Sequence, residues 1–472
     1  MTNENTKAGY GDESPIAAFA TTPGNSALTL IRCSGKNSIE LISSVFLSAK
    51  GKDASQFIET AGNTIVHGWI ISAGEKIDEV LVSVFRAPKS YTGEDSLDIC
   101  CHGGGAAGNA VMNIIKNAGF RDALPGEFTF RSFMNGKIDL TRSESVMELV
   151  SAKTDLGRRH AVSRLGGSLE KEINELKNML VQVLAAAEIF LDYSEDEISA
   201  DSDEEKAGRL PKREVAMDVL KRLKELAASW HLERIYQEGI TLVIAGPPNA
   251  GKSSLFNSLL KEDRSIVTEV PGTTRDWIEA FVSIEGIPVR LIDTAGLRDS
   301  ADSVEKIGIE RSRKLLEEAD LVLYLLNEDE INNKNTSCLS EYLYIWNKCD
   351  ISPLPKPFPI QNINPISVSA KTGEGLKELY TEIISAINKQ TADLKSNDRF
   401  SSASVGTVRQ KKLVDAACIA LEEAFALEEN EEPLDLIAPL LRYAVNSLGE
   451  ITGEVSTADI LEEMFSRFCV GK

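Results

Sequence analysis

No long apolar run occurs in the 472-residue sequence, and its first 14 residues are polar and mildly acidic. A helix that crosses a bilayer needs about 18 or more consecutive apolar residues, and a secretory signal needs a shorter apolar core near the N-terminus. Because neither pattern is present, we expect a chain that is neither secreted nor inserted in a membrane.

Cysteine is sparse. Seven cysteines are scattered over the whole length, and only Cys100 and Cys101 are adjacent. The count is odd, and the spacings do not form pairs of metal ligands. This usage favours reduced thiols and a cytoplasmic location.

Basic side chains are in deficit, since 51 lysines and arginines stand against 72 aspartates and glutamates, for a net charge of −21. This charge argues against broad electrostatic binding of nucleic acid, so a nucleic-acid partner would need a local basic groove. The densest acidic run, residues 192–205, is typical of a solvated loop.

The periodicity of apolar residues divides the chain into regions. Residues 15–125 carry β-branched runs broken by glycine and proline, as in an α+β domain. Residues 141–191 and about 213–237 show helical periodicity, interrupted mainly at Gly166 and Gly167. From Gly239 to about Ile387 apolar strands alternate with amphipathic helices, and helical periodicity returns after a polar linker. We therefore expect an α/β domain inserted into a helical domain.

A glycine-bearing loop, GPPNAGKS, follows the apolar strand ITLVIA and precedes helical sequence. This is the GxxxxGK[ST] pattern in its strand-loop-helix setting. Glycines let backbone N–H groups surround phosphates, Lys252 can reach the outer phosphates, and Ser253 can bind Mg²⁺. The pattern predicts a nucleotide site.

Three further motifs indicate that the base is guanine. Asp293-Thr-Ala-Gly296 ends an apolar strand, where the carboxylate can hold the Mg²⁺ shell and the Gly296 amide can meet the γ-phosphate. The run Asn347-Lys-Cys-Asp350 resembles the NKxD motif of the GTPase superfamily, in which the aspartate accepts both N–H groups of guanine. Ser369-Ala-Lys371 resembles the loop that supports the base.

A polar segment from Thr268 to Asp276 is suited to a mobile switch, in which Thr274 is the second hydroxyl ligand of Mg²⁺. Leu297 follows the DTAG motif and cannot orient a water molecule, so another group must do so. The predicted nucleotide-binding residues are Asn249, Ala250, Gly251, Lys252, Ser253, Ser254, Thr268, Glu269, Val270, Pro271, Gly272, Thr273, Thr274, Asp293, Thr294, Ala295, Gly296, Asn347, Lys348, Asp350, Ser369, Ala370 and Lys371.

Further motifs extend beyond the nucleotide loops: GPPNAGKSSLFNSLL, PGTTRD, SYTGEDSLDICCHGG, LPGEFTFRSFMNGKIDLTRSES and the ending FCVGK, which Ras-like and ribosome-assembly GTPases lack. Through these motifs nearly the whole chain resembles the MnmE (TrmE) family of tRNA-modifying GTPases. Phe130 stands where the family usually carries a basic residue, which predicts a weaker RNA or partner contact. Val470 in place of isoleucine and Cys349 in NKxD are smaller departures.

The resemblance implies a fold of several domains, α/β plus α. The expected domains are an α+β domain at 1–128 that binds tetrahydrofolate and dimerises, a helical domain at 129–237 and 389–472, and a Ras-like P-loop GTPase domain at 238–388 inserted into it.

The resemblance also implies a K⁺ ion on Asn249, Thr268, Val270 and Thr273, where a cation supplies charge that an arginine supplies in other GTPases. It assigns the orientation of the attacking water to Glu305. Taken without the family, Glu305 is one acid in a polar helix start. The catalytic residues are therefore expected to be Glu305, Lys252 and Cys469.

The resemblance places a tetrahydrofolate derivative, in its 5-formyl or methylene form, on Arg32, Glu94, Lys137 and Lys472. Each alone would read as a solvated charge. Cys469 could be a nucleophile, a redox partner or a small apolar residue. His102 with Gly103–Gly105 could suggest a metal or phosphate loop, but a tight turn explains it more simply.

The implied activity is GTP hydrolysis coupled to modification of the wobble uridine (position 34) of certain tRNAs at C5. The product would carry an aminomethyl or carboxymethylaminomethyl group. The implied partners are a second copy of the chain, tRNA, and MnmG (GidA), which holds FAD. The alternatives are a regulatory or ribosome-assembly GTPase without modification chemistry, and a folate-binding module whose GTPase gates a partner.

Overall fold

The structure is a computed structural model that describes residues 9–22, 24, 26–49, 54–192, 210–262, 278–284, 287–293, 315–316, 319–327, 342–359, 363–391 and 403–472. The chain forms two compact units, residues 1–147 with 446–472 and residues 148–445. The division falls within the helices α5 (Leu140–Ser151) and α14 (Leu434–Thr452). The boundary expected at residue 128 falls inside α4 (Glu127–Met134), which lies in the first unit.

The first unit is built on a seven-stranded sheet in the order β3-β4-β5-β6-β2-β1-β7. All neighbouring strands are antiparallel except β1 and β7, which are parallel. The strands are β1 (Ile16–Phe19), β2 (Leu28–Ser34), β3 (Phe46–Ser48), β4 (Thr64–Ser72), β5 (Glu75–Phe85), β6 (Ser96–His102) and β7 (Arg121–Asp122).

Alternation along these strands separates a buried face from an exposed one. Ile31, Val82 and Ile99 point into a core that also includes residues of α1 (Ser38–Ser43), α2 (Ala54–Ile58) and α3 (Gly105–Asn117). Leucine and isoleucine side chains on the opposite face stay exposed, namely Leu28, Leu47, Ile65 and Leu81. The turn expected at His102–Gly105 is present, since β6 ends at His102 and α3 begins at Gly105.

Distant parts of the sequence complete the first unit. The helix α15 (Ala458–Ser466) packs against α4 through an aromatic cluster. The Phe130 ring centroid lies 5.2 Å from Tyr10 and 5.4 Å from Phe465, at edge-to-face or tilted angles that favour aromatic pairs. The aromatic side chain at position 130 therefore joins residues from both ends of the chain.

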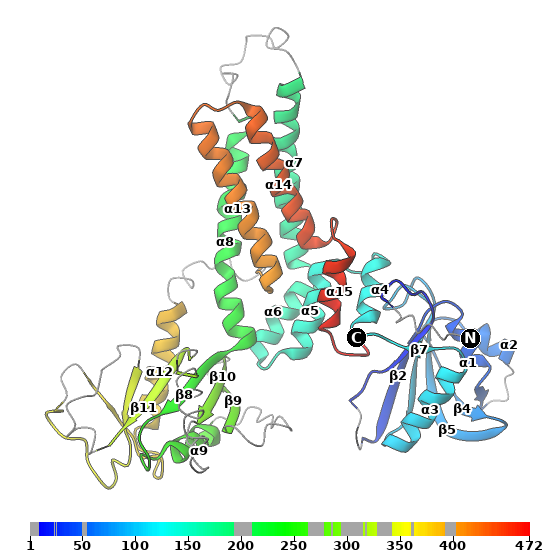
Figure 1. Ribbon diagram of the computed structural model, residues 1–472. Helices are drawn as coiled ribbons and strands as arrows, with labels where there is room; N and C mark the ends of the chain where they lie inside the picture. Colours follow the sequence, from blue (N-terminus) through cyan, green and yellow to red (C-terminus); the bar gives the residue numbers. More distant parts are fainter. Residues whose placement is uncertain are drawn as a thin grey trace, which may run out of the picture. The chain divides into compact units, whose positions relative to one another are not determined.

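The second unit begins with a helical bundle, in which α8 packs against α7 and α13, and an ion pair between Arg442 and Glu188 links α14 to α7 (Figure 1). Its helices, besides α5 and α14, are α6 (Asp155–Leu165), α7 (Ser168–Asp192), α8 (Arg213–Glu238) and α13 (Val408–Glu429). The predicted break at Gly166 and Gly167 separates α6 from α7. A second break, at 152–154, was not predicted; there the Thr154 hydroxyl caps α6 by accepting a hydrogen bond from the Gly157 amide.

The two helical segments of the sequence form one domain. The fully buried Arg164 of α6 donates to Glu148 of α5 at 2.8 Å and to Glu233 of α8 at 2.7 Å. It also donates to the Ser404 hydroxyl, just before α13, at 2.9 Å. The α/β part is therefore an insertion in the helical domain, and the predicted fold class is confirmed.

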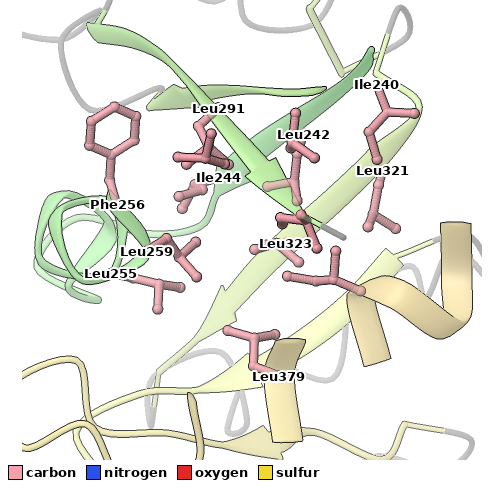
Figure 2. Close-up of a cluster of buried hydrophobic side chains, with 14 of the residues drawn as sticks. Ile240, Leu242, Ile244, Leu255, Phe256, Leu259, Leu291, Leu321, Leu323 and Leu379 are labelled. Carbon is pink, nitrogen blue, oxygen red and sulfur yellow. The ribbon is translucent and has the colours of Figure 1, made fainter. Parts of the chain in front are cut away.

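The inserted domain has a six-stranded sheet in the order β13-β12-β11-β8-β10-β9, parallel except for β9. Its elements are β8 (Ile240–Ala245), α9 (Lys252–Glu262), β9 (Ile278–Ile284), β10 (Ile287–Asp293), β11 (Leu321–Leu326), β12 (Tyr342–Trp346), β13 (Ile366–Ser367) and α12 (Leu376–Thr391). Leu242 and Ile244 of the central strand pack with Leu255 of α9 and Leu379 of α12 (Figure 2). No helix among the described residues is long and apolar enough to cross a membrane.

Candidate nucleotide and folate sites

The predicted phosphate loop joins β8 to α9 at the carboxyl edge of the parallel sheet. Asn249 has a φ of 61° and Gly251 a φ of 93°, so the chain turns twice through the left-handed region before α9 begins at Lys252. A Cβ at Gly251 would overlap the Asn347 side-chain amide. These turns direct the N-terminus of α9 toward the space beyond β8, which is the arrangement that binds phosphate.

Two predicted phosphate and magnesium residues lie at this edge. Lys252 is buried, and its Nζ donates to the carbonyls of Gly246 at 3.1 Å and Pro247 at 2.9 Å. The Ser253 hydroxyl donates to Oδ2 of Asp293, the last residue of β10, at 2.7 Å. A hydroxyl and a carboxylate are hard oxygen donors, which fit Mg²⁺.

Asn347, which follows β12, connects the phosphate loop to the loop after β13. Its Nδ2 donates to the Ala250 carbonyl at 3.0 Å, and its Oδ1 accepts from the Ala370 amide at 3.2 Å. The neighbouring Lys348 donates from Nζ to the Asn249 carbonyl at 2.6 Å. Asn347 and Lys348 therefore hold the loops that surround a nucleotide.

The predicted base-reading carboxylate is exposed and oriented. The Ser369 hydroxyl donates to Oδ1 of Asp350 at 2.7 Å, and the Thr372 amide donates to the Ser369 oxygen at 3.2 Å. Ser258 of α9 also donates to the Ala370 carbonyl at 2.6 Å. The Asp350 carboxylate keeps acceptor positions for the two N–H groups of a guanine edge.

The structure thus brings together Asn249, Ala250, Gly251, Lys252, Ser253, Asp293, Asn347, Lys348, Asp350, Ser369 and Ala370, with Ser254 and Lys371 adjacent in sequence. The remaining predicted residues lie outside the described part of the chain: Thr268, Glu269, Val270, Pro271, Gly272, Thr273, Thr274, Thr294, Ala295, Gly296 and Glu305. Of the expected K⁺ ligands only Asn249 is described. Its side chain is exposed and carries an amide oxygen, a type of ligand that K⁺ binds.

In the first unit, Arg32 lies on the face of the sheet opposite the core. Its guanidinium donates to Asp98 through Nε at 3.0 Å and lies over the Tyr91 and Phe128 rings at 5.9 and 6.0 Å. Burial raises the pKa of Tyr91, although its hydrogen bond with Thr129 and the charge of Arg32 act in the opposite direction. A planar cation beside aromatic rings suits a flat heteroaromatic ligand such as a pterin.

Glu94 binds Ser34, which is two residues beyond Arg32 on the same side of β2. The Ser34 hydroxyl donates to Oε2 of Glu94 at 2.8 Å, and Nη1 of Arg131 lies 3.2 Å from the same oxygen. The Glu94 side chain remains 24 % exposed, which leaves the carboxylate accessible to a ligand.

The other predicted folate residues flank this cluster. Lys137 donates from Nζ to the Pro88 carbonyl at 2.8 Å, and its side chain passes the α-carbon of Gly93. Gly471, with a φ of 92°, packs against the backbone of Phe19 and Ala20, so Lys472 reaches the strand that pairs with β2. A carboxylate and several cations in one region fit the charge pattern of a folate.

Cys469 is an exposed free thiol, and its carbonyl accepts from the Gly126 amide at 3.3 Å. None of the cysteines in the described ranges forms a disulfide. The same ranges contain no group of three or more His, Cys, Asp or Glu residues that could hold a metal. The structure therefore places Cys469 beside the start of α4 without a metal-binding environment.

The sequence did not indicate that Ser34 and Arg131 contact Glu94 or that Tyr91 lies beside Arg32. The spacing of Glu127 and Arg131, four residues apart in a helix, was a signal for an ion pair. The sequence did not indicate that this pair is buried.

Family comparisons cover nearly the whole chain. Residues 15–137 match the GTP-binding protein TrmE N-terminus, and residues 140–469 match the MnmE helical domain. The tRNA modification GTPase MnmE of Treponema denticola is 42 % identical, with 99 % of each chain covered. That of Carboxydothermus hydrogenoformans is 38 % identical over 98 % of this chain and 100 % of the relative. The G domain of the FeoB iron transporter of T. maritima aligns with 31 % of this chain and 98 % of its own, at 25 % identity and a TM-score of 0.25.

Proposed function

The chain belongs to the MnmE family of tRNA modification GTPases, and we propose that its GTP hydrolysis drives modification of C5 of the wobble uridine (position 34) of certain tRNAs. It is a GTP-hydrolysing enzyme that takes part in tRNA modification. The added group is aminomethyl or carboxymethylaminomethyl, the partner is the FAD-dependent MnmG (GidA), and the setting is the cytoplasm. One observation supports the GTPase assignment: the phosphate loop, Asp293 and Asp350 lie at the same edge of the sheet.

In the proposed hydrolysis, Lys252 leaves the carbonyls of Gly246 and Pro247 and turns to the outer phosphates. Ser253 and Thr274 would hold Mg²⁺, which would supply positive charge to the phosphates. Asn249, with Thr268, Val270 and Thr273, takes K⁺, and Glu305 orients the attacking water. Exposed Asn249 and the leucine that follows DTAG support this division of roles.

Potassium dependence has a direct test. GTP turnover by the purified protein is compared in KCl and NaCl at equal ionic strength. We expect a sharp fall in sodium, because the larger ion fits a site of several oxygen donors at longer distances. Equal rates in the two salts would remove the K⁺ assignment and leave the GTPase assignment intact.

The proposed folate site uses Arg32, Glu94, Lys137 and Lys472 to bind a 5-formyl- or methylene-tetrahydrofolate, which supplies the one-carbon unit. The Tyr91 ring beside Arg32 and the hydrogen bond that orients Glu94 support this proposal.

A second copy of the chain is proposed to cover the exposed face of the first sheet, where Leu28, Ile65 and Leu81 are 57 %, 66 % and 47 % exposed. Cys469 is proposed to take part in the chemistry.

Nucleoside analysis tests the modification activity. Transfer RNA is taken from cells that lack the protein and from the same cells complemented with the wild type or with Cys469→Ser. We expect the C5 modification at position 34 to disappear without the protein and to return with the wild type. Unchanged wobble uridines would favour the alternative, a regulatory or ribosome-assembly GTPase. Full restoration by Cys469→Ser would remove the thiol from the chemistry.

A further inference from the structure

A chain of ion pairs leads to Glu94 in the first unit, and its central members, Glu127 and Arg131, are buried. Glu127 and Arg131 lie four residues apart on α4, and Glu127 is fully buried. Arg121 donates to Glu127 from both terminal guanidinium nitrogens, from Nη1 to Oε2 at 2.8 Å and from Nη2 to Oε1 at 2.6 Å. Burial alone would lower the pKa of Arg121, but the hydrogen bonds and charges of Glu127 and Asp12 raise it overall. This two-pronged contact fixes the position of Glu127.

Glu127 in turn fixes Arg131. Nη2 of Arg131 donates to Oε1 of Glu127 at 2.9 Å and to the carbonyls of Asp12 and Ser14 at 3.0 and 2.8 Å. With only 5 % of the residue exposed, the guanidinium has one orientation. Its Nη1 therefore points to the Glu94 carboxylate, 3.3 Å from Oε1 and 3.2 Å from Oε2.

We propose that Arg131 is a positioning residue for the folate donor, because it orients the Glu94 carboxylate to accept the N–H groups of the pterin ring. The inference rests on the folate site proposed above. Arg131 itself is too buried to contact the ligand, so it acts through Glu94. Glu127 and Arg121 hold Arg131 in place, one and two contacts farther from the ligand.

A double-mutant cycle tests this role in the full-length protein. The dissociation constant of 5-formyl-tetrahydrofolate is measured by calorimetry for the wild type, Arg131→Gln, Glu94→Gln and the double variant. We expect Arg131→Gln to weaken binding by roughly 10- to 100-fold, as loss of an orienting partner does at other sites. In the Glu94→Gln background the same change should cause no further loss, since the group through which it acts is already changed.

Two measurements separate positioning from folding. Arg131→Lys keeps a buried cation near Glu127 but loses the fork, so it should fold and bind with intermediate affinity. Lys116→Gln, which breaks the exposed pair with Asp122, is the matched control and should bind as the wild type does. GTP affinity should stay unchanged in all variants.

The outcomes are distinct. A wild type that binds no 5-formyl-tetrahydrofolate would overturn the folate site and this inference with it. A wild type that binds, with Arg131→Gln and Arg131→Lys binding equally well, would overturn the positioning role alone. Losses that multiply in the double variant would show that Arg131 acts independently of Glu94 and would also overturn it.

Discussion

The nucleotide site and the proposed folate site use different means to hold their polar groups. At the nucleotide site, backbone turns and amide contacts place the groups, and each functional segment directly follows a parallel strand. At the proposed folate site, charged side chains from well-separated segments converge and are held by ion pairs, of which Glu127–Arg131 is buried. A phosphate is bound by backbone N–H groups, whereas a folate requires side-chain charges at several points. Substitutions should therefore affect the two sites through different mechanisms.

The largest effect is expected at Asp350, the carboxylate that is proposed to read the guanine base. Asp350→Asn replaces one acceptor by a donor, so it should lose both the charge and one hydrogen bond to guanine. We expect GTP affinity to fall by roughly 1,000-fold, since hydrogen bonds to charged groups contribute about 1.5–3 kcal/mol each.

Xanthine carries a carbonyl where guanine carries its amino group, so the asparagine should accept from one ring N–H and donate to that carbonyl. Nucleotide titration should show a gain in XTP affinity. Equal losses of GTP and XTP would show that Asp350 has a structural role and does not read the base.

The next effect tests whether backbone geometry dominates the phosphate loop. Gly251→Ala places a Cβ at a φ of 93° and against the Asn347 amide. Strain at such a position costs about 1–3 kcal/mol before the clash is counted, so GTP affinity should fall by about 100-fold. Gly373 has a φ of 84° with open space around it, so Gly373→Ala is the matched control and should cost less. Equal losses would assign the effect to the φ angle alone.

The smallest effect tests this contrast, because the proposed folate site also depends on glycine backbone conformation, for example at Gly471. Gly471→Ala would place a Cβ against the Phe19 carbonyl at a φ of 92° and shift Lys472. We expect about tenfold weaker binding of 5-formyl-tetrahydrofolate, the loss of roughly one charged contact. Calorimetry measures it, with GTP affinity as the control. Unchanged folate binding would show that Lys472 does not contact the ligand.

The difference between the sites also explains how far the sequence could predict them. The order of strands and helices from β8 to α12 follows from hydrophobic alternation, and the loops GPPNAGKS and NKCD are contiguous in sequence, so they could be recognised directly. The break before α6 could not be predicted from periodicity, because it depends on the Thr154 cap. Arg131 and Glu127 looked like ordinary charges of an amphipathic helix, since their burial depends on Asp12, Ser14 and Arg121 from other segments.

The docking of residues 446–472 onto the first unit has a consequence for synthesis of the protein. The N-terminal sheet emerges from the ribosome first, but the ring of Phe130 and the backbone of Phe19 are covered by residues made after the second unit. The whole second unit must be translated in the interval. Completion of the first unit therefore waits for translation of the second, and a nascent chain stopped before α15 leaves its aromatic cluster open to chaperones.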